Sequence, residues 1–488
     1  MATTITIDPV TRIEGHLKLE VTADYVGGRQ QVVDARAAGT LFRGFETILS
    51  GRDPFDAPDI TARICGVCPT PHNQAAVAAI DAAMGIEVPD NARLLRNLVL
   101  AADFLHSHIL HFYQLAVLDF IEPPGMAPWQ PGWTEDIRID PATSATLVEH
   151  YVAALDARRK AHEMGAVFGG RLPHTAAFIG SGFSGMPSAA RIQQFRAYAA
   201  EVVAFVRDVY LPDVDAIAAT YQDYFQIGAG PRNLLAFGCF EEGPTGADKL
   251  LRRGRRAAGS TAIAAVDIQK ITEDVASSWY TGNNGVSPRS GTTTPAYPKT
   301  NAYSWLKSPR YETKVYEVGP LARMTVNGDY AGGVSVMDRH LARAAEAMKI
   351  GLALEGWLDQ LDPSGPLFAD GSMPESASGI GLTEAPRGAL GHWLAVGNRT
   401  ISRYQIVTPT CWNASPRDAR GVRGALEQAL VGTPVQNAGQ PVEVLRVVHS
   451  FDPCLSCAVH VMRPGAAAPV SVLSGGGWTS RSAARAYR

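Results

Sequence analysis

The chain has 488 residues, of which 46% are hydrophobic. It is therefore long enough to bury a sizeable core, as one large domain or as two or three ordinary ones. Its formal net charge of -3 and its pI near 6.5 give no electrostatic reason to bind nucleic acid or an anionic membrane surface. Six cysteines in so long a chain do not make a disulfide scaffold, and residues 1–21 lack the charged-then-apolar pattern of a secretory signal.

The predicted elements begin with strands and continue with long helices. Alternation of polar and apolar residues from Thr4 to about Ala38 predicts a small β-sheet. A 3.6-residue period then predicts helices over residues 71–83, 91–121, 143–165, 187–223, 338–361 and 416–430. Stretches rich in Pro, Gly and Ser lie between them, at 123–141, 282–300 and 362–379.

The most apolar long stretch, residues 94–121, is expected to be a buried core helix. It contains Asp103, His106, His108, His111 and Asp119, which are too many polar side chains for contact with lipid. The sequence shows no internal repeat and no linker long enough to separate independent domains. These features predict one α+β domain, predominantly helical, with a central bundle of long helices and small peripheral β-sheets.

Four of the six cysteines form two CxxC pairs near opposite ends of the chain. Cys65 and Cys68 lie in RICGVCPTPH (63–72), and Cys454 and Cys457 lie in FDPCLSCAVH (451–460). Soft thiolates suit zinc, nickel and iron. Zinc ribbons place their two pairs close together, whereas 385 residues (69–453) separate these pairs. A four-thiolate metal site held by the whole fold is the main interpretation, and two unrelated CxxC elements are the alternative.

With these two motifs the sequence resembles the large subunits of nickel-iron hydrogenases. The resemblance extends over essentially the whole chain, because DPVTRIEGH (8–16), LFRGFE (41–46), EAPRGALGHW (384–393) and YQIVTPTCWNASPRD (404–418) also match in order. It implies the large-subunit fold and the reversible oxidation of H2 to protons and electrons. It further implies that Cys65 and Cys454 bind nickel terminally, while Cys68 and Cys457 bridge the nickel to an iron that carries cyanide and carbon monoxide ligands.

The resemblance assigns catalytic roles to three charged side chains. Glu14 matches a glutamate that relays protons, which heterolytic cleavage of H2 requires; without the match, a salt bridge to Arg12 would be the preferred interpretation. Arg387, which follows Pro386 at the same site, matches an arginine over the open face of the metals. Asp452 is the expected carboxylate that orients this arginine, and an ordinary ion pair is the alternative.

Two more side chains are expected to contact the metal centre. Thr410 matches a hydroxyl that donates to a cyanide ligand, and a turn or cap hydroxyl is the alternative. His72 would lie one helical turn beyond Cys68 if a helix begins there, in position to hydrogen-bond a cysteine sulfur. One departure is visible, because Ser107 precedes His108 where many relatives have an aspartate. The remaining cysteines, at 239 and 411, match no ligand position and are expected to be core residues.

The resemblance also implies a magnesium site near the C-terminal motif. Glu46, His460 and the main-chain carbonyl of Ile406 match its ligands, and iron takes the position in some relatives. A carboxylate, a carbonyl and waters suit a hard cation, whereas a histidine is less usual.

Three other functions are alternatives to this one, and each can be distinguished by a specific feature. A H2-sensing relative is disfavoured because Val67 and Leu115 have the sizes typical of turnover enzymes, and because 28 residues follow His460. A quinone-reductase subunit that has lost the metals would lack the four paired cysteines. A zinc-stabilised scaffold would bind zinc without nickel.

The resemblance implies partners for electron transfer and for maturation. Two cysteines outside the pairs cannot hold an iron-sulfur cluster, which typically takes four, so we expect an iron-sulfur small subunit and no nucleic-acid partner. Residues 303–324 are most similar to membrane-associated uptake enzymes, which implies a cytochrome b or other membrane acceptor and a peripheral place at the cell membrane. Nickel-insertion proteins and a protease that cuts after His460 are implied too. The cut would leave a single domain over residues 1–460 and remove residues 461–488.

Overall fold

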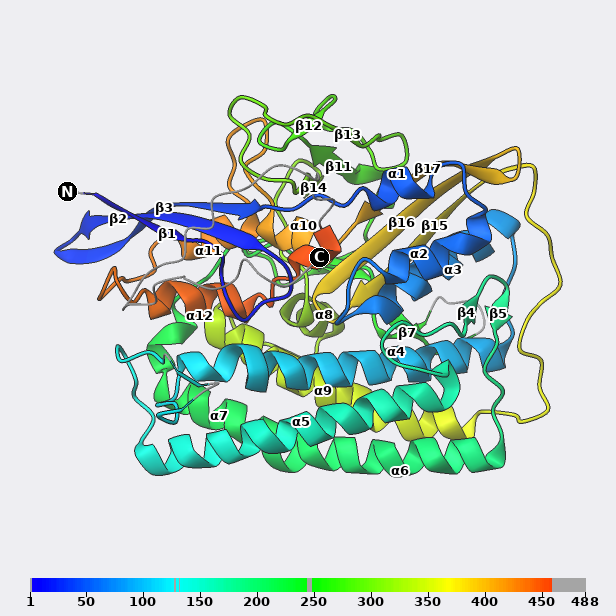
Figure 1. Ribbon diagram of the computed structural model, residues 1–488, viewed down its shortest axis with the longest axis horizontal. Coiled ribbons are helices and arrows are strands. Elements are labelled where there is room, and N and C mark those ends of the chain that lie inside the picture. The colour runs from blue at the N-terminus through cyan, green and yellow to red at the C-terminus, as the bar shows by residue number, and fades with distance from the viewer. Residues whose placement is uncertain (1, 127–128, 131, 244–247, 459–488) are drawn as a thin grey trace, which may run out of the picture.

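A layer of long helices lies beneath several small antiparallel sheets (Figure 1). The computed structural model describes residues 2–126, 129–130, 132–243 and 248–458. The longest helices are α4 (Asp90–Leu110), α5 (Pro141–Gly169), α6 (Ala189–Phe205) and α9 (Val336–Asp359). Helix α4 packs against α5 and α9, and α5 packs against α6. The expected α+β fold with a central bundle of long helices is confirmed.

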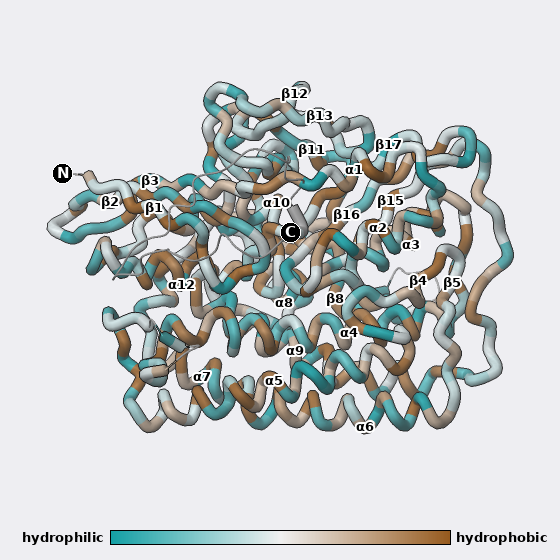
Figure 2. The backbone as a smooth tube through the Cα atoms, viewed as in Figure 1, coloured by the Kyte–Doolittle hydropathy of each residue, from teal (hydrophilic) through white to brown (hydrophobic). Residues whose placement is uncertain are grey.

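Helix α4 is the central helix of this layer. Every residue from Asn91 to Leu110 is buried, as predicted for this stretch. The outer helices α5 and α6 instead alternate hydrophobic and hydrophilic residues along their length, as Figure 2 shows. Asp140 begins α5 by accepting hydrogen bonds from the N–H groups of Ala142 and Thr143, and Pro141 takes the first helical position, where no N–H is needed.

Three of the predicted helices differ from the observed ones. Residues 91–121 do not form one helix, because α4 passes into a π-helical turn at His111–Ala116 and a 3₁₀ turn at Val117–Asp119. Residues 187–223 are divided by a π-helical turn at Val206–Tyr210, followed by α7 (Leu211–Thr220) and a 3₁₀ turn at Gln222–Phe225. Pro212, near the start of α7, has no N–H to continue the hydrogen-bond ladder of α6.

The helix predicted over residues 416–430 is wrong in its first half. Only α11 (Ala425–Leu430) is helical. In the preceding segment the Asp418 carboxylate accepts hydrogen bonds from the N–H groups of Arg420 and Val422, and Gly421 has a φ of 77°. The side chain of Asp418 thus stabilises a turn that competes with the helix.

Two three-stranded sheets flank the centre of the molecule. The first has the order β1 (Thr3–Ile7), β2 (Leu17–Val26), β3 (Arg29–Gly39), and alternate residues of β2 are buried, as the period-two pattern predicted. The second has the order β15 (Ser376–Ala385), β16 (Gly388–Gly397), β17 (Thr400–Val407). Helix α3 (Pro69–Met84) lies directly on β15. A Cβ at Gly381 would lie 1.9 Å from the carbonyl oxygen of Ala75, so only glycine permits this contact.

The remaining elements are short. The helices are α1 (Phe45–Leu49), α2 (Ala57–Ala62), α8 (Pro320–Asn327), α10 (Pro409–Ala414) and α12 (Val442–Ser450), with 3₁₀ turns at Pro54–Asp56, Ile268–Lys270 and Leu455–Ala458. The strands are β4 (Phe178–Ile179), β5 (Gly182–Phe183), β6 (Leu234–Ala236), β7 (Cys239–Glu241), β8 (Lys249–Leu251), β9 (Gly254–Arg256), β10 (Ile263–Ala264), β11 (Ile271–Asp274), β12 (Tyr280–Thr281), β13 (Thr294–Pro295) and β14 (Ser308–Tyr311).

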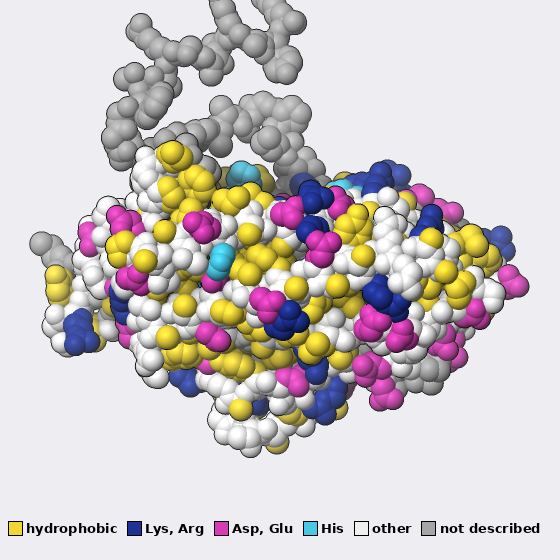
Figure 3. Space-filling view, turned by 90° about the horizontal axis from the view of Figure 1, so that it is seen from below, with side chains coloured by type: hydrophobic (Ala, Val, Ile, Leu, Met, Phe, Trp, Pro, Cys, Tyr) yellow, Lys and Arg dark blue, Asp and Glu magenta, His cyan; other side chains and the backbone are white. Residues whose placement is uncertain are grey.

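The outer face of α5 and α6 carries side chains of both charges. Figure 3 shows acidic and basic groups side by side on this face, with hydrophobic patches between them. Ion pairs such as Arg159 with Glu163 and Arg196 with Glu355 account for part of this mixture. Among the helices of the described ranges, none combines the length and the apolar character needed to cross a bilayer.

Candidate metal centre

Thiols from the two ends of the chain meet in the interior. The Sγ atom of Cys65 lies 3.3 Å from that of Cys68 and 3.4 Å from that of Cys454. These separations exceed the S–S bond length of about 2.05 Å, and sulfurs about 2.3 Å from one metal ion can lie this close together. All three residues are buried. In the described part of the chain they are the one group of three or more side chains with metal-ligand spacing.

The fourth predicted thiol belongs to the same segment. Cys457 lies in the 3₁₀ turn Leu455–Ala458, of which the structure describes the backbone at this position. His460 lies outside the described residues.

The N-terminal segment that carries Glu14 pairs directly with the segment that carries Cys454. The N–H of Leu455 donates to the carbonyl of Glu14 at 2.6 Å, and Glu14 and Cys454 form a parallel β-bridge. Arg43 adds a second connection, because its guanidinium donates to the carbonyls of Ile64 and Ser456. One backbone hydrogen bond and the Arg43 guanidinium thus connect the C-terminal cysteine segment to segments within the first 64 residues.

The Glu14 side chain faces the thiols and is partly buried. Burial raises the pKa of its carboxyl above the ordinary value of 4.5, and the neighbouring Cys65 raises it further. A hydrogen bond with Ser456 and the positive charges of Arg387 and Arg43 oppose this rise. A carboxyl group whose pKa moves towards neutrality is suited to accept and release protons.

Arg387 occupies the turn of the hairpin between β15 and β16, above the thiols. It is buried, its Nη2 lies 3.0 Å from Asp452 Oδ1, and its Nη1 donates to Ser107 Oγ at 3.4 Å. The Asp452 contact is an ion pair whose angles do not meet those of a hydrogen bond. Burial lowers the pKa of Arg387, but Asp452 and the cysteine sulfurs outweigh it and raise the pKa well above its usual range. The guanidinium is therefore permanently charged.

A buried ion cluster that the sequence did not reveal supports this hairpin turn. Arg323 of α8 contacts Glu346 of α9 at 2.7 Å and Glu384 of β15 at 2.8 Å. The same guanidinium donates to the carbonyls of Ala385 and Pro386. All three charged side chains are fully buried. Their partners are 23 and 61 residues apart in sequence, so no local pattern could have indicated the cluster.

Thr410 and His72 lie near the paired cysteines, and each has a polar partner. The Cys454 N–H donates to Thr410 Oγ1 at 3.0 Å, so the hydroxyl keeps its own proton for another acceptor. Cys68 precedes the first residue of α3, which places His72 in its first turn. The Nδ1 of His72 lies 3.2 Å from His392 Nε2, and burial lowers the pKa of His72 to about 4, so this imidazole is neutral.

Glu46 and Ile406, two of the three residues predicted for magnesium, lie in a second polar cluster. Glu46 accepts the N–H of Ile406 at 2.8 Å and the hydroxyl of Thr293. Lys307 lies 3.6 Å from Glu46 and 3.5 Å from Glu273, and burial raises the pKa of Glu273 to about 7. Carboxylate and carbonyl oxygens fit a hard cation, while the Lys307 ammonium balances part of the negative charge.

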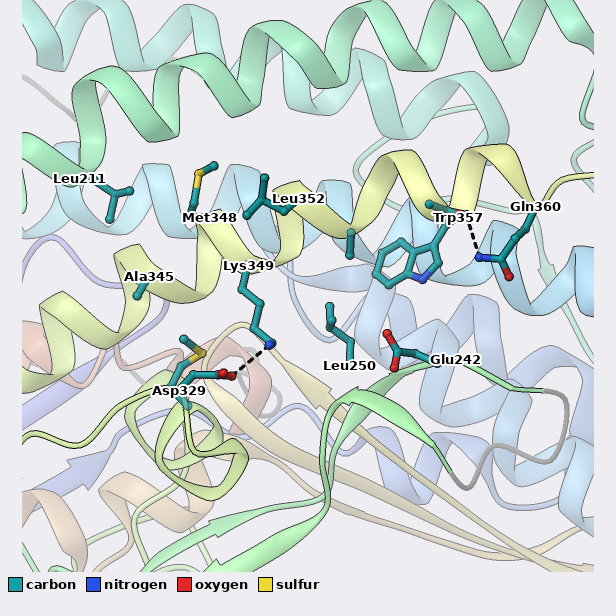
Figure 4. Close-up of a pocket in the computed structure, with 13 residues that line it drawn as sticks. Leu211, Glu242, Leu250, Asp329, Ala345, Met348, Lys349, Leu352, Trp357 and Gln360 are labelled. Carbon is teal, nitrogen blue, oxygen red and sulfur yellow. Dashed lines mark hydrogen bonds and ion pairs between the residues drawn. The ribbon is translucent and has the colours of Figure 1, made fainter.

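Two other features lie apart from the thiols. Cys239 and Cys411 are buried in the hydrophobic core, as expected for them. A groove of about 710 Å³ along the outer side of α9 is shown in Figure 4; its lining includes Leu211, Leu352 and Trp357, and its Lys349 is paired with Asp329 at 3.1 Å. None of the predicted site residues lines this groove.

Comparison with known proteins identifies the architecture. The family described as "Nickel-dependent hydrogenase" matches residues 43–137, 124–334 and 327–460, and the family described as "HoxL-like" matches residues 4–37. The periplasmic [NiFeSe] hydrogenase large subunit of Desulfomicrobium baculatum is 41% identical, over 94% of this chain and 95% of that protein. The uptake hydrogenase large subunit of Rhizobium leguminosarum bv. viciae is 33% identical, over 94% and 95%.

Solved structures agree with these sequence relatives. The reduced Ni-Fe-Se hydrogenase of D. vulgaris Hildenborough has a TM-score of 0.90 and 43% identity, and the match covers 94% of this chain and 100% of that chain. A reduced, active Ni-Fe-Se hydrogenase from Desulfomicrobium baculatum has the same TM-score and 42% identity, with the same coverage. The names of these two solved structures include selenium, whereas this chain has cysteine at all four paired positions.

Proposed function

We propose, from the premise that this chain belongs to the nickel-dependent hydrogenase family as a catalytic large subunit, that Cys65, Cys68, Cys454 and Cys457 hold its nickel-iron centre. The established family activity is the cleavage of H2 to protons and electrons. Uptake hydrogenases among the relatives favour H2 oxidation as the net direction.

The observation that carries this proposal is the meeting of three buried thiols at 3.3 and 3.4 Å beneath Arg387. Buried thiolates are costly unless positive charge compensates them. Soft metal ions supply that charge, and thiolate sulfur is the donor that nickel and iron prefer here. The donor set thus fits a nickel-iron centre. Cys65 and Cys454 would bind the nickel, and Cys68 and Cys457 would hold the iron with it, an iron that would carry cyanide and carbon monoxide.

The side chains around the centre then take distinct roles. When bound, the metals supply the heterolytic cleavage of H2. Glu14 receives the released proton at its carboxylate oxygen, because it faces the thiols and its pKa is raised. Arg387 holds a fixed positive charge over the site, and Asp452 at 3.0 Å restrains its orientation.

Three uncharged groups complete the surroundings. Pro386, in the same buried turn, excludes water. Thr410 anchors the Cys454 backbone and offers its proton to a cyanide ligand. His72 is kept neutral by burial. Its contact with His392 fixes the orientation of its ring near the thiols.

The finer assignments of cofactor, partner and location belong to the same proposal. Glu46, the Ile406 main chain and His460 would bind magnesium, or iron in its place. Electrons would leave through an iron-sulfur small subunit, because the described ranges hold no second cluster of metal-ligating side chains. A cytochrome b or other membrane acceptor would follow, which places the heterodimer peripherally at the cell membrane.

Removal of a C-terminal extension is also proposed. The family match ends at residue 460, and the solved relatives cover 94% of this chain but 100% of their own. Nickel-insertion proteins would load residues 1–460, a single domain, before a protease cuts after His460. The intact mass of the nickel-loaded protein should therefore equal that of residues 1–460, without residues 461–488.

The activity is tested with the purified heterodimer. We expect H2 oxidation with a dye acceptor to be lost in Cys65→Ala, because one thiolate ligand is removed. The control is Cys239→Ala, which removes an equally buried thiol away from the site and should retain turnover. Full activity in Cys65→Ala would contradict the proposed centre.

A further inference from the structure

His449, in the last turn of α12, is a buried histidine that none of the roles above uses. Both nitrogens of its ring face oxygen atoms. Nδ1 lies 2.5 Å from Oδ2 of Asp119, and Nε2 lies 3.0 Å from the main-chain oxygen of Thr11. A carbonyl oxygen has no hydrogen and can only accept, so Nε2 must donate to Thr11.

The partner of the other ring nitrogen is an ionised carboxylate. Asp119 ends the 3₁₀ turn Val117–Asp119 and is fully buried. Its Oδ1 forms an ion pair with Arg12 and accepts the indole N–H of Trp133 at 3.0 Å. Burial would raise the pKa of Asp119, but Arg12 and His449 outweigh burial and lower the pKa below 3.8. An ionised carboxylate only accepts, so both ring nitrogens of His449 donate, and the ring is an imidazolium.

The other titratable groups near this imidazolium are compatible with its charge. They are Arg446 on the preceding turn of α12, His111 on the π-helical turn and His340 on α9. Arg446 is paired with Asp136, and His340 is neutral because burial lowers its pKa to about 3. His111 Nε2 donates to the main-chain oxygen of His449 at 2.6 Å. The last turn of a helix also favours a cation, because its carbonyl groups carry partial negative charge.

His449 joins the segment that carries Glu14 to the segment that carries Asp452. Its ring donates to Thr11, three residues before Glu14, and its main-chain oxygen accepts the N–H of Asp452 at 2.9 Å. A displacement of this histidine would therefore change the distance between two side chains that have roles at the thiols.

Both segments have an unfavourable backbone conformation beside these contacts. Arg12 has a φ of 56° and Asp452 a φ of 54°, and this left-handed region is uncommon for residues other than glycine. Arg12 is held there by Asp119 and by the carbonyl of Leu115, which accepts from its Nη1 at 2.8 Å. The N–H of Asp452 is held by His449. Backbone strain persists only where the surrounding structure fixes it, and it is found most often at functional sites.

We propose that His449, as an imidazolium held between Asp119 and Thr11, is a positioning residue for the reaction at the thiols. It fixes the distance between the segment of Glu14 and that of Asp452. The proposal rests on the proposed function, in which Glu14 accepts the proton. The imidazolium keeps both of its protons throughout, and no bond to it forms or breaks. Loss of its contact with Thr11 would free the N-terminal segment and displace Glu14.

Two variants separate the two hydrogen bonds of His449 in the purified, nickel-loaded heterodimer. The amide nitrogen of asparagine takes the place of Nδ1, and that of glutamine takes the place of Nε2. His449→Asn should therefore lose the Thr11 contact, and His449→Gln should keep it. We expect turnover of His449→Asn to fall by up to about 10²-fold, the effect of displacing a reacting group by about 1 Å. Its KM for H2 and its nickel content should not change. His449→Gln should retain most of the wild-type turnover.

Backbone hydrogen exchange gives a readout that does not depend on turnover. The N–H of Leu455 donates to the carbonyl of Glu14, so its exchange rate reports how firmly the two segments are joined. This N–H should exchange faster in His449→Asn and at the wild-type rate in His449→Gln. His150→Asn is the matched control, because His150 of α5 also contacts an aspartate through Nδ1, Asp213 at 2.8 Å. It should leave both turnover and exchange unchanged.

Raman spectra in D2O test the charge of His449 directly, because an imidazolium has a band that a neutral histidine lacks. At pH 8, above the ordinary histidine pKa of about 6.5, the wild-type spectrum minus that of His449→Gln should contain this band. A difference spectrum without the band would show that the ring is neutral and would overturn the proposal.

The kinetic outcomes can overturn the proposal as well. Wild-type turnover in His449→Asn, equal losses in both His449 variants, or a raised KM in place of a lower turnover would show that the Thr11 contact does not position Glu14. Loss of nickel from His449→Asn would show a structural role and would overturn it too. Absence of nickel from the wild-type protein would instead refute the proposed function, and the Raman band would still report the charge of His449.

Discussion

At Gly15 the N-terminal segment lies against the backbone of the C-terminal cysteine segment. A Cβ at this position would lie 2.4 Å from the N atom of Ser456, and Gly15 has a φ of +86°. Both the space and the backbone conformation require glycine. The neighbour Glu14 owes its position beside the thiols to this contact.

Gly15→Ala should therefore destabilise the protein through two effects. The left-handed φ costs an alanine about 1–2 kcal/mol, and the clash with Ser456 adds to it. Gly28→Ala is the control, because Gly28 has a φ of +82° but its Cβ would meet nothing within 4 Å. Thermal unfolding should show a clearly larger loss of Tm for Gly15→Ala, together with a lower nickel content. Equal losses in the two variants would remove the steric argument.

Glu14→Gln tests the proton acceptor at the thiols. The deprotonated carboxylate accepts the proton of H2, and burial raises its pKa above 4.5. H2 oxidation by the wild type should therefore rise with pH through that raised pKa. The variant should lose this acidic limb, and its turnover should fall by a factor of about 10²–10⁴. It should still retain nickel. A pH profile that keeps its acidic limb would assign the proton to another group.

Single residues were predictable from the sequence where a motif carries them. The spacing of Cys65 and Cys68 indicated a metal before any fold was known. Asp119 and Lys307 could not be recognised in the same way, because their environments come from segments distant in sequence. A lone Asp or Lys acquires a shifted pKa only when the fold buries it.

At the scale of elements, the turn of the β15–β16 hairpin is stabilised by a charged side chain from outside the hairpin. Arg323 of α8 holds the turn through Glu346 and Glu384, and all three are fully buried. Removal of one partner from a buried ion cluster leaves uncompensated charge.

Arg323→Met should cost about 3–5 kcal/mol of unfolding free energy. It should also lower turnover, because Arg387 would lose its rigid support. Arg196→Met is the matched control: this arginine is more exposed and pairs with Glu355 and Asp359, so it should cost at most about 1 kcal/mol. Denaturant unfolding of the two variants provides the comparison. Similar costs would show that the buried cluster does not stabilise the hairpin.

Helix α11 is joined to β3 by Glu427, which accepts hydrogen bonds from the Ala37 N–H at 3.0 Å and the Tyr303 hydroxyl at 2.8 Å. Burial raises its pKa from 4.5 to about 7. The folded state thus binds this proton more tightly than the unfolded state, so the group's stabilisation is complete below pH 4.5. It is lost as pH rises through about 7, a change of about 3 kcal/mol.

Glu427→Gln should remove this contribution to the pH dependence. Unfolding free energies of the wild type and the variant, measured between pH 4.5 and 8, should differ in slope. The wild type should lose stability relative to the variant as pH rises. Parallel curves would mean that Glu427 ionises in the fold as it does in the unfolded chain.

Helices were predicted well where one period runs unbroken. Helix α9 was expected over residues 338–361 and extends over Val336–Asp359. The prediction failed at the π-helical turns at His111 and Val206, because one additional residue in a turn barely alters the hydrophobic pattern. It also failed before α11, where the Asp418 side chain stabilises a turn.

At the scale of the whole molecule, the candidate metal site forms where segments near the two ends of the chain meet. The segments of Glu14, Cys65 and Cys454 are far apart in sequence and lie together in the interior of the molecule. The large distance in sequence between the CxxC pairs predicted that the whole fold would bring them together. The identity of the metals did not follow from spacing; it came from the family to which the chain belongs.

The nickel content of the purified heterodimer tests this account most directly. We predict stoichiometric nickel with iron in the wild type, loss of nickel in Cys454→Ala, and retention in Cys239→Ala, which removes a buried thiol outside the centre. Elemental mass spectrometry on the three proteins gives the answer. Zinc in place of nickel, or nickel undiminished in Cys454→Ala, would contradict the proposed centre.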